Sequence, residues 1–411
     1  MTDVEAAVAA AFREEWGHVV ATLIRMTGNW DLAEECAQDA FAAALAHWPA
    51  DGVPLRPGAW LTTTARNRAL DRLRRSKTEA AKLQEVAVMS GPAEPPSPDD
   101  SGVTDDRLRL IFTCCHPALT LEARVALTLR TLVGLTTAEI AKAFLVPEAT
   151  MAKRLTRAKH KIRDARIPYR VPPAHLLPDR LSGVLGVLYL LFNEGYSASA
   201  GAQVRRGDLT AEAIRLARLL VALMPDEPET VGLLALMLLQ DARTAARLDD
   251  DGDLVTLEDQ DRSRWDAEEI AAGLALLDDA VRRAPAGPYR VQATIAACHA
   301  RAAVAADTDW AQIAALYGEL RLLVPSAVVE LNRAVAVAMA HGPAAGLVLV
   351  DELAEGGALT SYYLLPATRA DLLRRLDRRP EAADSYREAL ALAPTEPERR
   401  YLRRRLTEVG G

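Results

Sequence analysis

The chain is poor in the residues that build disulfide-rich, membrane-spanning or β-sheet proteins. It has only four cysteines in 411 residues, which excludes a disulfide scaffold and is typical of a reducing cytoplasm. Its longest apolar run, Leu181–Phe192, is too short to cross a bilayer, and the N-terminus has no signal-peptide pattern. Sustained period-two alternation of β-branched residues is also missing. These deficits predict a cytoplasmic, all-α protein that has no membrane partner.

Metal-binding patterns are equally scarce. Cys114, Cys115 and His116 are adjacent, but neighbouring helical residues point about 100° apart and no second Cys/His pair lies nearby in the sequence, so we expect core packing. The acidic stretch DDDGD, Asp249–Asp253, fails as a calcium loop because alignment on its glycine places an arginine at the first ligand position. We expect a solvated loop there and no metal.

Catalytic motifs are not evident either. The stretch NEGYSASAG, Asn193–Gly201, lacks the lysine of a phosphate loop, and no nucleophile–base pair stands beside its Glu194 and Tyr196. We therefore predict no catalytic residue and no cofactor, and we expect that the protein is not an enzyme.

The net charge of −7 hides an asymmetry along the chain. Residues 1–175 hold 23 Lys/Arg and 21 Asp/Glu, whereas residues 176–411 hold 26 and 35. Two basic islands stand out in the first part, Arg56–Lys82 and Lys153–Arg166. Contact with nucleic acid is therefore expected in the first 170 or so residues, and the acidic remainder must serve another purpose.

The first basic island follows an acidic helix. GNWDLAEECAQDAFAAALAHWP, residues 28–49, predicts an amphipathic helix that is capped near Asn29 or Asp31 and ends before Pro49. Residues 56–75 predict a second helix, with Trp60 and Leu61 facing inward and its arginines facing outward.

The second island has the pattern of a helix-turn-helix. Thr136 or Thr137 can cap a short helix, and Pro147 ends it while tolerating the start of the next. The second helix is expected to bury a stripe at three- and four-residue spacing, with basic residues on its other faces: Met151, Leu155, Ala158 and Ile162. This pattern is typical of a helix that enters a major groove, but an ordinary helical hairpin with a solvated charged face stays open.

The remaining segments are linkers and helical repeats. Residues 84–104 include SGPAEPPSPDDSG and are expected to form a flexible linker, and residues 168–175, within and after IPYRVPP, a second linker or strap. Residues 176–411 read as Ala/Leu-rich helices, several of which close at a proline. Positions before Pro394 match the small/large pattern of a tetratricopeptide repeat: Ala389, Tyr386, Ala382, Leu373 and Ala370. Because the proline spacing is irregular, the repeats are degenerate.

Two of these motifs together resemble a known family. AEECAQDAF (33–41), followed by WLTTTARNRALDRLRR (60–75), resembles region 2 of an extracytoplasmic-function sigma factor, and TTAEIAKAFLVPEATMAKRLTRAK resembles its region 4. TCCHPAL, LYLLFNEGYSASAG and LEDQDRSRWD resemble stretches of a subfamily that has a long tetratricopeptide-like extension. The resemblance implies a region 2 helical bundle in residues 1–83, a region 4 helix-turn-helix bundle in residues 105–167, and a helical regulatory extension in residues 176–411.

The resemblance also implies three sets of site residues. The set expected to bind core RNA polymerase is Asp31, Glu34, Glu35, Gln38, Asp39 and Phe41. The set expected at the promoter −10 element, with Asn67 on a base, is Arg66, Asn67, Arg68, Arg72, Arg74 and Arg75. The set expected at the −35 element is Ala152, Lys153, Arg154, Thr156, Arg157, Lys159 and Lys161. Lys153 and Arg157 stand at base-reading positions, whereas Ala149 and Ala152 depart from the family pattern and leave the base contacts open.

The function implied is that of a sigma factor, which binds core RNA polymerase and promoter DNA and directs initiation. Two alternatives stay open: a polymerase-independent helix-turn-helix regulator with a helical sensor domain, and an enzyme tail fused to a DNA-binding head. The tail could bind an unknown protein or ligand. It could mask the DNA-binding helices, or it could be needed for transcription. We expect that it is needed, so that its removal reduces transcription.

Overall fold

The computed structural model describes residues 3–84, 106–144, 146–196, 207–283, 287–357 and 359–410, which form helices and one isolated bridge between Leu248 and Leu254. The all-α prediction is therefore confirmed. The chain divides into two compact units, Met1–Val187 and Leu188–Gly411. The predicted linker 84–104 lies, apart from Gln84, outside the described residues.

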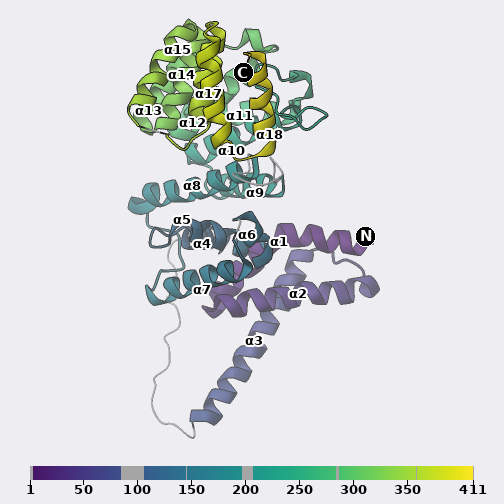
Figure 1. The fold of residues 1–411 in the computed structure, drawn as a ribbon. Helices are drawn as coiled ribbons and strands as arrows, with labels where there is room; N and C mark the ends of the chain where they lie inside the picture. The colour runs from purple at the N-terminus through teal and green to yellow at the C-terminus, as the bar shows by residue number, and fades with distance from the viewer. Residues whose placement is uncertain are drawn as a thin grey trace. The chain divides into compact units, whose positions relative to one another are not determined.

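Unit 1 contains three long helices followed by a set of shorter ones (Figure 1). In chain order they are α1 (Asp3–Thr27), α2 (Trp30–Asp51), α3 (Pro57–Gln84), α4 (Asp106–Cys114), α5 (Leu121–Thr128), the π-helical turn η1 (Leu129–Val133), α6 (Thr137–Ala143), α7 (Glu148–Asp164), the 3₁₀ turn η2 (Ala174–Leu176) and the first half of α8 (Leu177–Tyr196). Figure 1 shows the C-terminal half of α3 extending away from α1 and α2.

Helix α2 begins as predicted and ends later. The Asn29 side chain accepts a hydrogen bond from the Leu32 N–H at 3.1 Å, which confirms the predicted cap. The prediction that the helix stops before Pro49 is wrong, because Pro49 lies inside the last turn and the helix continues to Asp51. A proline this close to the end interrupts little of the hydrogen-bond ladder, and Gly52, at φ 80°, then ends the helix.

Helix α3 packs one face on α1 and α2. Leu61, Ala65 and Ala69 are fully buried, and the ring of Trp60 meets that of Trp48 edge-on at 5.6 Å. The predicted inward positions of Trp60 and Leu61 are therefore confirmed, and the alternate faces carry the arginines.

The helix-turn-helix segment forms as the sequence predicts. Thr136 and Glu139 exchange hydrogen bonds at the start of α6, with the Thr136 N–H donating to the Glu139 carboxylate at 2.7 Å. Helix α7 follows after Pro147, and its predicted stripe is buried. This stripe holds α7 on its neighbours, so the basic residues on the other faces remain available for contacts.

Buried thiols stabilise the centre of unit 1. Cys114 lies 3.2 Å from the Thr131 hydroxyl and Cys115 lies 3.8 Å from that of Thr128, and burial raises the pKa of both thiols, that of Cys115 to about 11. The prediction of core packing for the two cysteines is confirmed. Among the described residues, no group of three His, Cys, Asp or Glu side chains is placed to hold a metal.

The segment after α7, residues 167–173, packs on α1 and on the start of α4 within unit 1. The Tyr169 hydroxyl donates to the Ala21 carbonyl at 2.9 Å and to the Asp106 carbonyl at 3.3 Å. Arg180, early in α8, donates to the Phe112 carbonyl at 2.7 Å. Because α8 continues as one helix through Val187, the boundary between the units falls inside this helix and not in the predicted linker 168–175.

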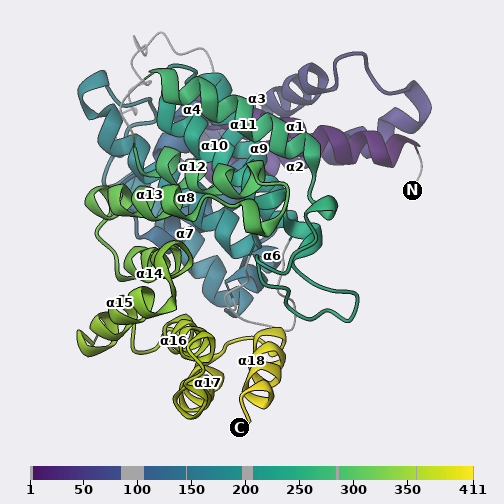
Figure 2. The ribbon, with the colours of Figure 1, turned by 90° about the horizontal axis from the view of Figure 1, so that it is seen from above.

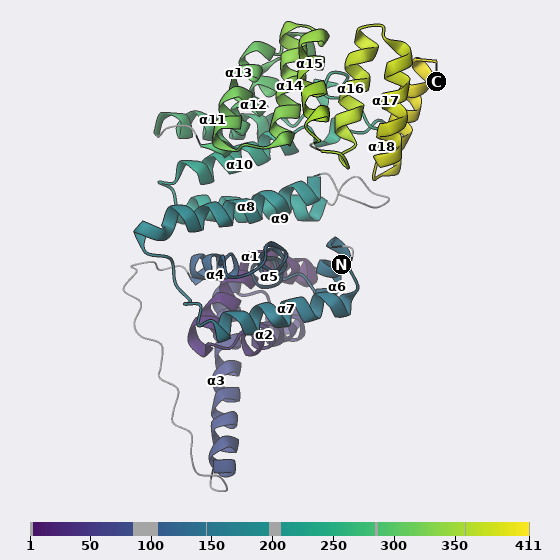
Figure 3. The ribbon, with the colours of Figure 1, turned by 60° about the vertical axis from the view of Figure 1, so that its left-hand side comes forward.

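Unit 2 contains the second half of α8 and a series of helices that follow one another in chain order (Figure 2). They are α9 (Gly207–Leu223), α10 (Pro228–Asp241), η3 (Thr244–Ala246), η4 (Arg262–Arg264), α11 (Ala267–Arg283), α12 (Pro288–Arg301), η5 (Ala305–Asp307), α13 (Trp310–Leu323), α14 (Ala327–His341), α15 (Pro343–Glu355), α16 (Leu364–Arg375), α17 (Arg379–Leu392) and α18 (Glu396–Glu408). Figure 3 shows them as a row of neighbouring helices, as in a helical repeat.

The repeat pattern predicted before Pro394 is confirmed by burial. Ala370, Leu373, Ala382, Tyr386 and Ala389 all belong to one core cluster, and none is more than 2% exposed. Small residues let the helices approach closely: a Cβ added at Gly346 would lie 2.4 Å from the Cβ of Ala338. The part of the chain that the structure describes holds no helix long and apolar enough to span a membrane.

The connection between α10 and α11 is an acidic loop that binds the last helices of unit 2. Arg400 of α18 donates to Asp253 at 2.5 Å and to the Gly252 carbonyl at 2.9 Å. Arg375 of α16 binds Glu258 at 2.6 Å. The stretch expected to be a solvated loop is therefore partly bound by an arginine of its own unit.

Candidate polymerase and DNA interfaces

The acidic face of α2 is partly paired with α3. Arg72 binds Glu35 and also Asp39, the latter at 2.8 Å, and Arg68 lies 3.4 Å from Asp39. The Glu35 side chain is 59% exposed and that of Asp39 is 33% exposed. Two carboxylates predicted to bind polymerase thus pair with two arginines predicted to bind DNA.

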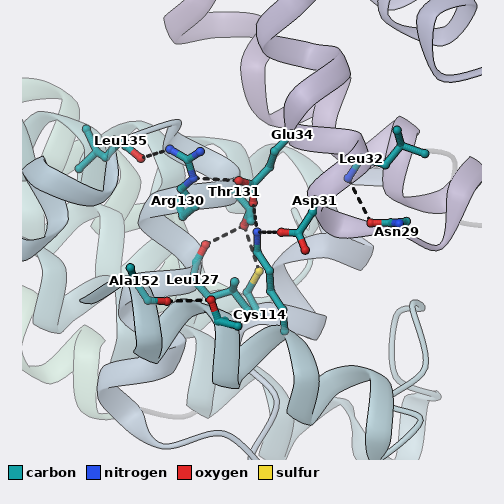
Figure 4. Close-up of polar contacts among 12 residues, drawn as sticks. Asn29, Asp31, Leu32, Glu34, Cys114, Leu127, Arg130, Thr131, Leu135 and Ala152 are labelled. Carbon is teal, nitrogen blue, oxygen red and sulfur yellow. Dashed lines mark hydrogen bonds and ion pairs between the residues drawn. The ribbon is translucent and has the colours of Figure 1, made fainter. Parts of the chain in front are cut away.

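Glu34 differs from its neighbours because it is buried. Its carboxylate lies 2.9 Å from Arg130 Nε and 2.8 Å from Lys159 Nζ, and Lys159 also reaches Asp31 at 2.7 Å (Figure 4). The side chains of Glu34 and Lys159 are only 7% and 13% exposed. The structure therefore brings one predicted polymerase-binding residue and one predicted DNA-binding residue into contact with each other.

Phe41 is a core residue and not an exposed anchor. It is 5% exposed, and its ring lies 5.0 Å from that of Phe12 and 6.0 Å from that of Trp16. It shares the inward side of α2 with Ala33, Ala37, Ala40 and Ala44, so the helix must turn it toward α1. The prediction that Phe41 projects toward a partner is wrong for this structure.

The residues expected at the −10 element lie within residues 66–75 of α3 and are spread over more than one side of the helix. Arg66, Asn67, Arg74 and Arg75 are exposed, whereas Arg68 and Arg72 are half-buried in the pairs with α2. An exposed asparagine between arginines can offer an amide to a base and cations to the backbone. Helix α3 thus presents the residue types that unpaired promoter DNA requires.

The residues expected at the −35 element lie on α7. Ala152, Lys153, Thr156, Arg157 and Lys161 are exposed, and Arg154 is half-buried. The Thr156 hydroxyl donates to the Ala152 carbonyl at 2.9 Å, within the helix. Lys159 is the exception, since its ammonium is turned toward α2. Hence α7 can offer Lys153 and Arg157 to base edges.

Sequence reasoning missed Arg130, which lies in the π-helical turn η1. Its guanidinium binds Glu34 and donates to the Leu135 carbonyl at 3.0 Å, and its own carbonyl accepts from the Trp16 indole N–H at 3.4 Å. A π turn inserts one residue into a helix and shifts the facing of those after it. Helical periodicity therefore gave no signal for this contact.

Two adjoining hollows that the sequence did not predict lie among the described residues of unit 2. One, about 900 Å³, is lined by polar groups that include Asp259, Arg262, His299 and Arg405. The other, about 360 Å³, is more apolar and is lined by Val335, Met339 and Leu372, among others. Thr256, Met339, Arg375 and Tyr401 line both hollows. Their volumes are those of ligand sites.

Arg405, which lines the larger hollow, is already paired with carboxylates. Arg405 lies 3.7 Å from Asp259 and 2.9 Å from Glu408. Burial lowers the pKa of His299 to about 3, helped by the nearby positive charges of Arg243 and Arg262. His299 is therefore neutral at physiological pH and is not poised as a general base. Glu194 and Tyr196, which the sequence raised as catalytic candidates, have no described side chains.

Comparisons with known proteins agree with this arrangement. Residues 12–79 match the family model for sigma-70 region 2, residues 109–162 match that for sigma-70 region 4, and residues 180–281 match a family of unknown function, DUF6596. An uncharacterized protein of Rhizobium meliloti is 44% identical over 395 residues, covering 95% of this chain and 93% of that protein.

A second relative carries a functional name. The probable ECF RNA polymerase sigma factor SigI of Mycobacterium tuberculosis is 29% identical over 170 residues, covering 41% of this chain and 58% of that protein. No solved structure matches the chain.

Two helical modules with these matches, in this order, define a protein of the sigma-70 class. The chain belongs to the extracytoplasmic-function sigma factors of that family and carries a C-terminal helical extension. It is a sigma factor that directs promoter-specific transcription initiation, and sigma factors act with core RNA polymerase and promoter DNA. The sigma families themselves are not enzymes.

Proposed function

We propose that core RNA polymerase binds the α2 face that carries Asp31, Glu35, Gln38 and Asp39. The observation that supports this is the exposure of the first three side chains on a helix whose opposite side is core. Such a face suits a basic helical partner. Glu34 can join this face only when Arg130 and Lys159 release it.

A single added charge tests the docking face. Reversing Glu35 or Asp39 would place a lysine beside Arg72, so it would disturb α3 as well. Gln38→Lys adds a positive charge at an exposed position, and His47→Lys does the same further along α2. We expect Gln38→Lys to weaken capture of core polymerase at least about tenfold and His47→Lys to leave it unchanged. Equal capture by both variants would reject the face.

For promoter DNA, we propose that Asn67 contacts a −10 base while Arg66, Arg74 and Arg75 neutralise phosphates. We propose that Lys153 and Arg157 read −35 bases, with Arg154 and Lys161 on phosphates. Run-off transcription with purified core polymerase tests this against the polymerase-independent regulator. The chain should confer specific start sites on core polymerase by itself, and failure to do so with a panel of genomic promoters would contradict the proposal.

We propose that the tail is not an enzyme but is needed for full transcription activity, and that its two hollows bind a protein segment or small ligand. We also propose that the protein works in the cytoplasm. The acidic loop weighs against a mask, because Asp253, Glu258 and Asp259 are paired with arginines of unit 2. The chain truncated after Val187 keeps the half of α8 that packs on unit 1, and it should transcribe less than the full chain at equal soluble concentration. Higher activity would favour the mask.

A further inference from the structure

We propose that unit 1 is a closed state, in which Arg130 and Lys159 occupy the α2 acidic face in place of the polymerase. Closure and polymerase binding then exclude each other, and the fraction of open molecules limits assembly of the holoenzyme. This inference rests on the proposed role of α2 in docking and adds a competitor from the same chain.

The first observation is the burial of the charges. Glu34 is bound by cations from two elements of region 4, Arg130 of η1 at 2.9 Å and Lys159 of α7 at 2.8 Å (Figure 4). Exposed ion pairs are weak, but these three side chains are at most 16% exposed. When partners are buried this deeply, substituting one of them leaves the other charge uncompensated inside the interface. The pairs therefore act as a latch and not as incidental surface contacts.

The second observation is close backbone packing beside the latch. A Cβ added at Gly17 of α1 would lie 2.8 Å from the Leu132 carbonyl oxygen, so only glycine lets η1 approach α1. Gly134, at φ 86°, closes η1 and leaves room for Phe12 and Trp16, whose rings would lie within 2.9 Å of a Cβ there. The two regions are thus fitted to each other by shape as well as charge.

A third set of contacts closes the far side of the same interface. Arg25 of α1 binds Asp106 at 2.8 Å, and Asp106 also binds Arg109 at 2.7 Å. The Tyr169 hydroxyl then joins the carbonyl groups of Ala21 and Asp106. Because contacts form at both ends of the interface between the two regions, we expect the closed arrangement to form and open cooperatively.

Charge complementarity explains why closure and docking compete. The α2 face is acidic, so any helix that binds it must supply cations, and Arg130 and Lys159 supply them from within the chain. A partner that requires the open form binds with an affinity reduced by the open fraction. Weakening the latch must therefore tighten binding of core polymerase, although no residue of the docking face has changed.

Gly17→Ala is the sharpest test because it carries no charge and touches neither proposed binding face. The added methyl group clashes only when η1 is packed on α1, and it favours the α1 helix otherwise. Gly186→Ala is the matched control, since Gly186 also lies inside a helix but a Cβ there would meet no atom within 4 Å. We expect Gly17→Ala to bind core polymerase about tenfold more tightly, which corresponds to roughly 1.4 kcal/mol of lost closure, and Gly186→Ala to match the wild type.

A second pair of variants separates the latch from DNA binding. Lys159→Gln and Lys161→Gln remove the same charge from α7, but only Lys159 contacts α2. Lys159→Gln should tighten binding to core polymerase in the absence of DNA, and Lys161→Gln should not. Unchanged or weaker core binding by both Gly17→Ala and Lys159→Gln, with helical content and thermal unfolding like the wild type, would overturn the closed-state proposal.

Cross-linking supplies the opposite perturbation. Cysteines introduced by Asp31→Cys and Lys159→Cys can be joined with a short bis-maleimide, because the four native cysteines are buried. Because Asp31 belongs to the proposed docking face, the reference is the same double variant with both cysteines capped by a monofunctional maleimide. The cross-linked protein should capture much less core polymerase than this reference. Full capture by the cross-linked form would refute competition. If the wild type itself does not bind core polymerase, the proposed docking role of α2 is wrong. That result differs from either loss or retention of capture by the cross-linked form, which both require that the wild type binds.

Discussion

Replacing Arg262 by alanine should destabilise unit 2 strongly, because one guanidinium joins the α10–α11 loop to α12 and the segment after it. It donates to the carbonyl oxygens of His299 at 2.7 Å and Ala302 at 2.6 Å and to the Thr308 hydroxyl at 2.9 Å. It also lies 5.0 Å from the ring centre of Trp265. Hydrogen bonds from a charged donor contribute roughly 1.5–3 kcal/mol each, and water that enters the alanine variant recovers part of this, so we expect a loss of about 3–5 kcal/mol.

Two further variants make this test specific. Arg264→Ala removes the same charge from an exposed position of the same turn and should change the free energy of unfolding by less than about 0.5 kcal/mol. Arg262→Lys keeps the charge but not the planar fork, so its loss should be intermediate. Urea unfolding of the full chain, followed by circular dichroism, gives the three values. A difference below about 1 kcal/mol between Arg262→Ala and Arg264→Ala would refute the structural role that we assign to this arginine.

Three other predictions concern DNA recognition, packing and pH. Arg157→Ala should weaken promoters at one or two −35 positions while Arg163→Ala weakens all sequences evenly, and a uniform loss for Arg157→Ala in a promoter library would reject base contact. Gly346→Ala should lower the thermal midpoint of unit 2, because the added Cβ would lie 2.4 Å from the Cβ of Ala338. Gly318→Ala should raise the midpoint slightly, because a Cβ there would meet no atom within 4 Å and alanine favours a helix. Equal shifts for the two variants would contradict the packing argument. Burial, with Asp241 and Asp266 nearby, raises the pKa of Glu269 to about 7, above its unfolded value. The stability that this group contributes is therefore present in acid and is lost as the pH rises through about 7. Glu269→Gln should flatten the fall in the free energy of unfolding between about pH 5 and 8, and an unchanged slope would disprove this.

Local patterns explain why much of the fold was predictable. The buried stripe of α7 and the small/large pattern around Tyr386 repeat at helical spacing, so the sequence alone identifies the inward face. The cap at Asn29 is also local, because its side-chain oxygen accepts from the N–H of Leu32, only three residues further along the chain. These features depend on residues close together in the chain, and all of them are confirmed.

The residues that were misplaced depend on distant partners. Phe41 and Glu34 are seven residues apart and lie on nearly the same side of α2, where Phe41 meets Phe12 and Trp16 of α1 and Glu34 meets Arg130 and Lys159. The buried side of α2 therefore contains a charged residue beside its apolar residues, and the sequence of α2 does not show which acid is buried. Arg130 depends further on a π turn, which a pattern of 3.6 residues per turn does not reveal. The roles of the exposed site residues stay predictions.

The bonds from the α10–α11 loop to α16 and α18 change how the repeat layer should unfold. In an open row of repeats each helix pair contacts only its neighbours, so the last pair frays first and the rest survives. Here Arg400 reaches back 147 residues to Asp253, so the final helix is also a contact of an early loop. Loss of α18 would therefore loosen the row at two places at once. Hydrogen exchange should show α18 and the 248–259 loop opening together, as one cooperative unit rather than as independent ends.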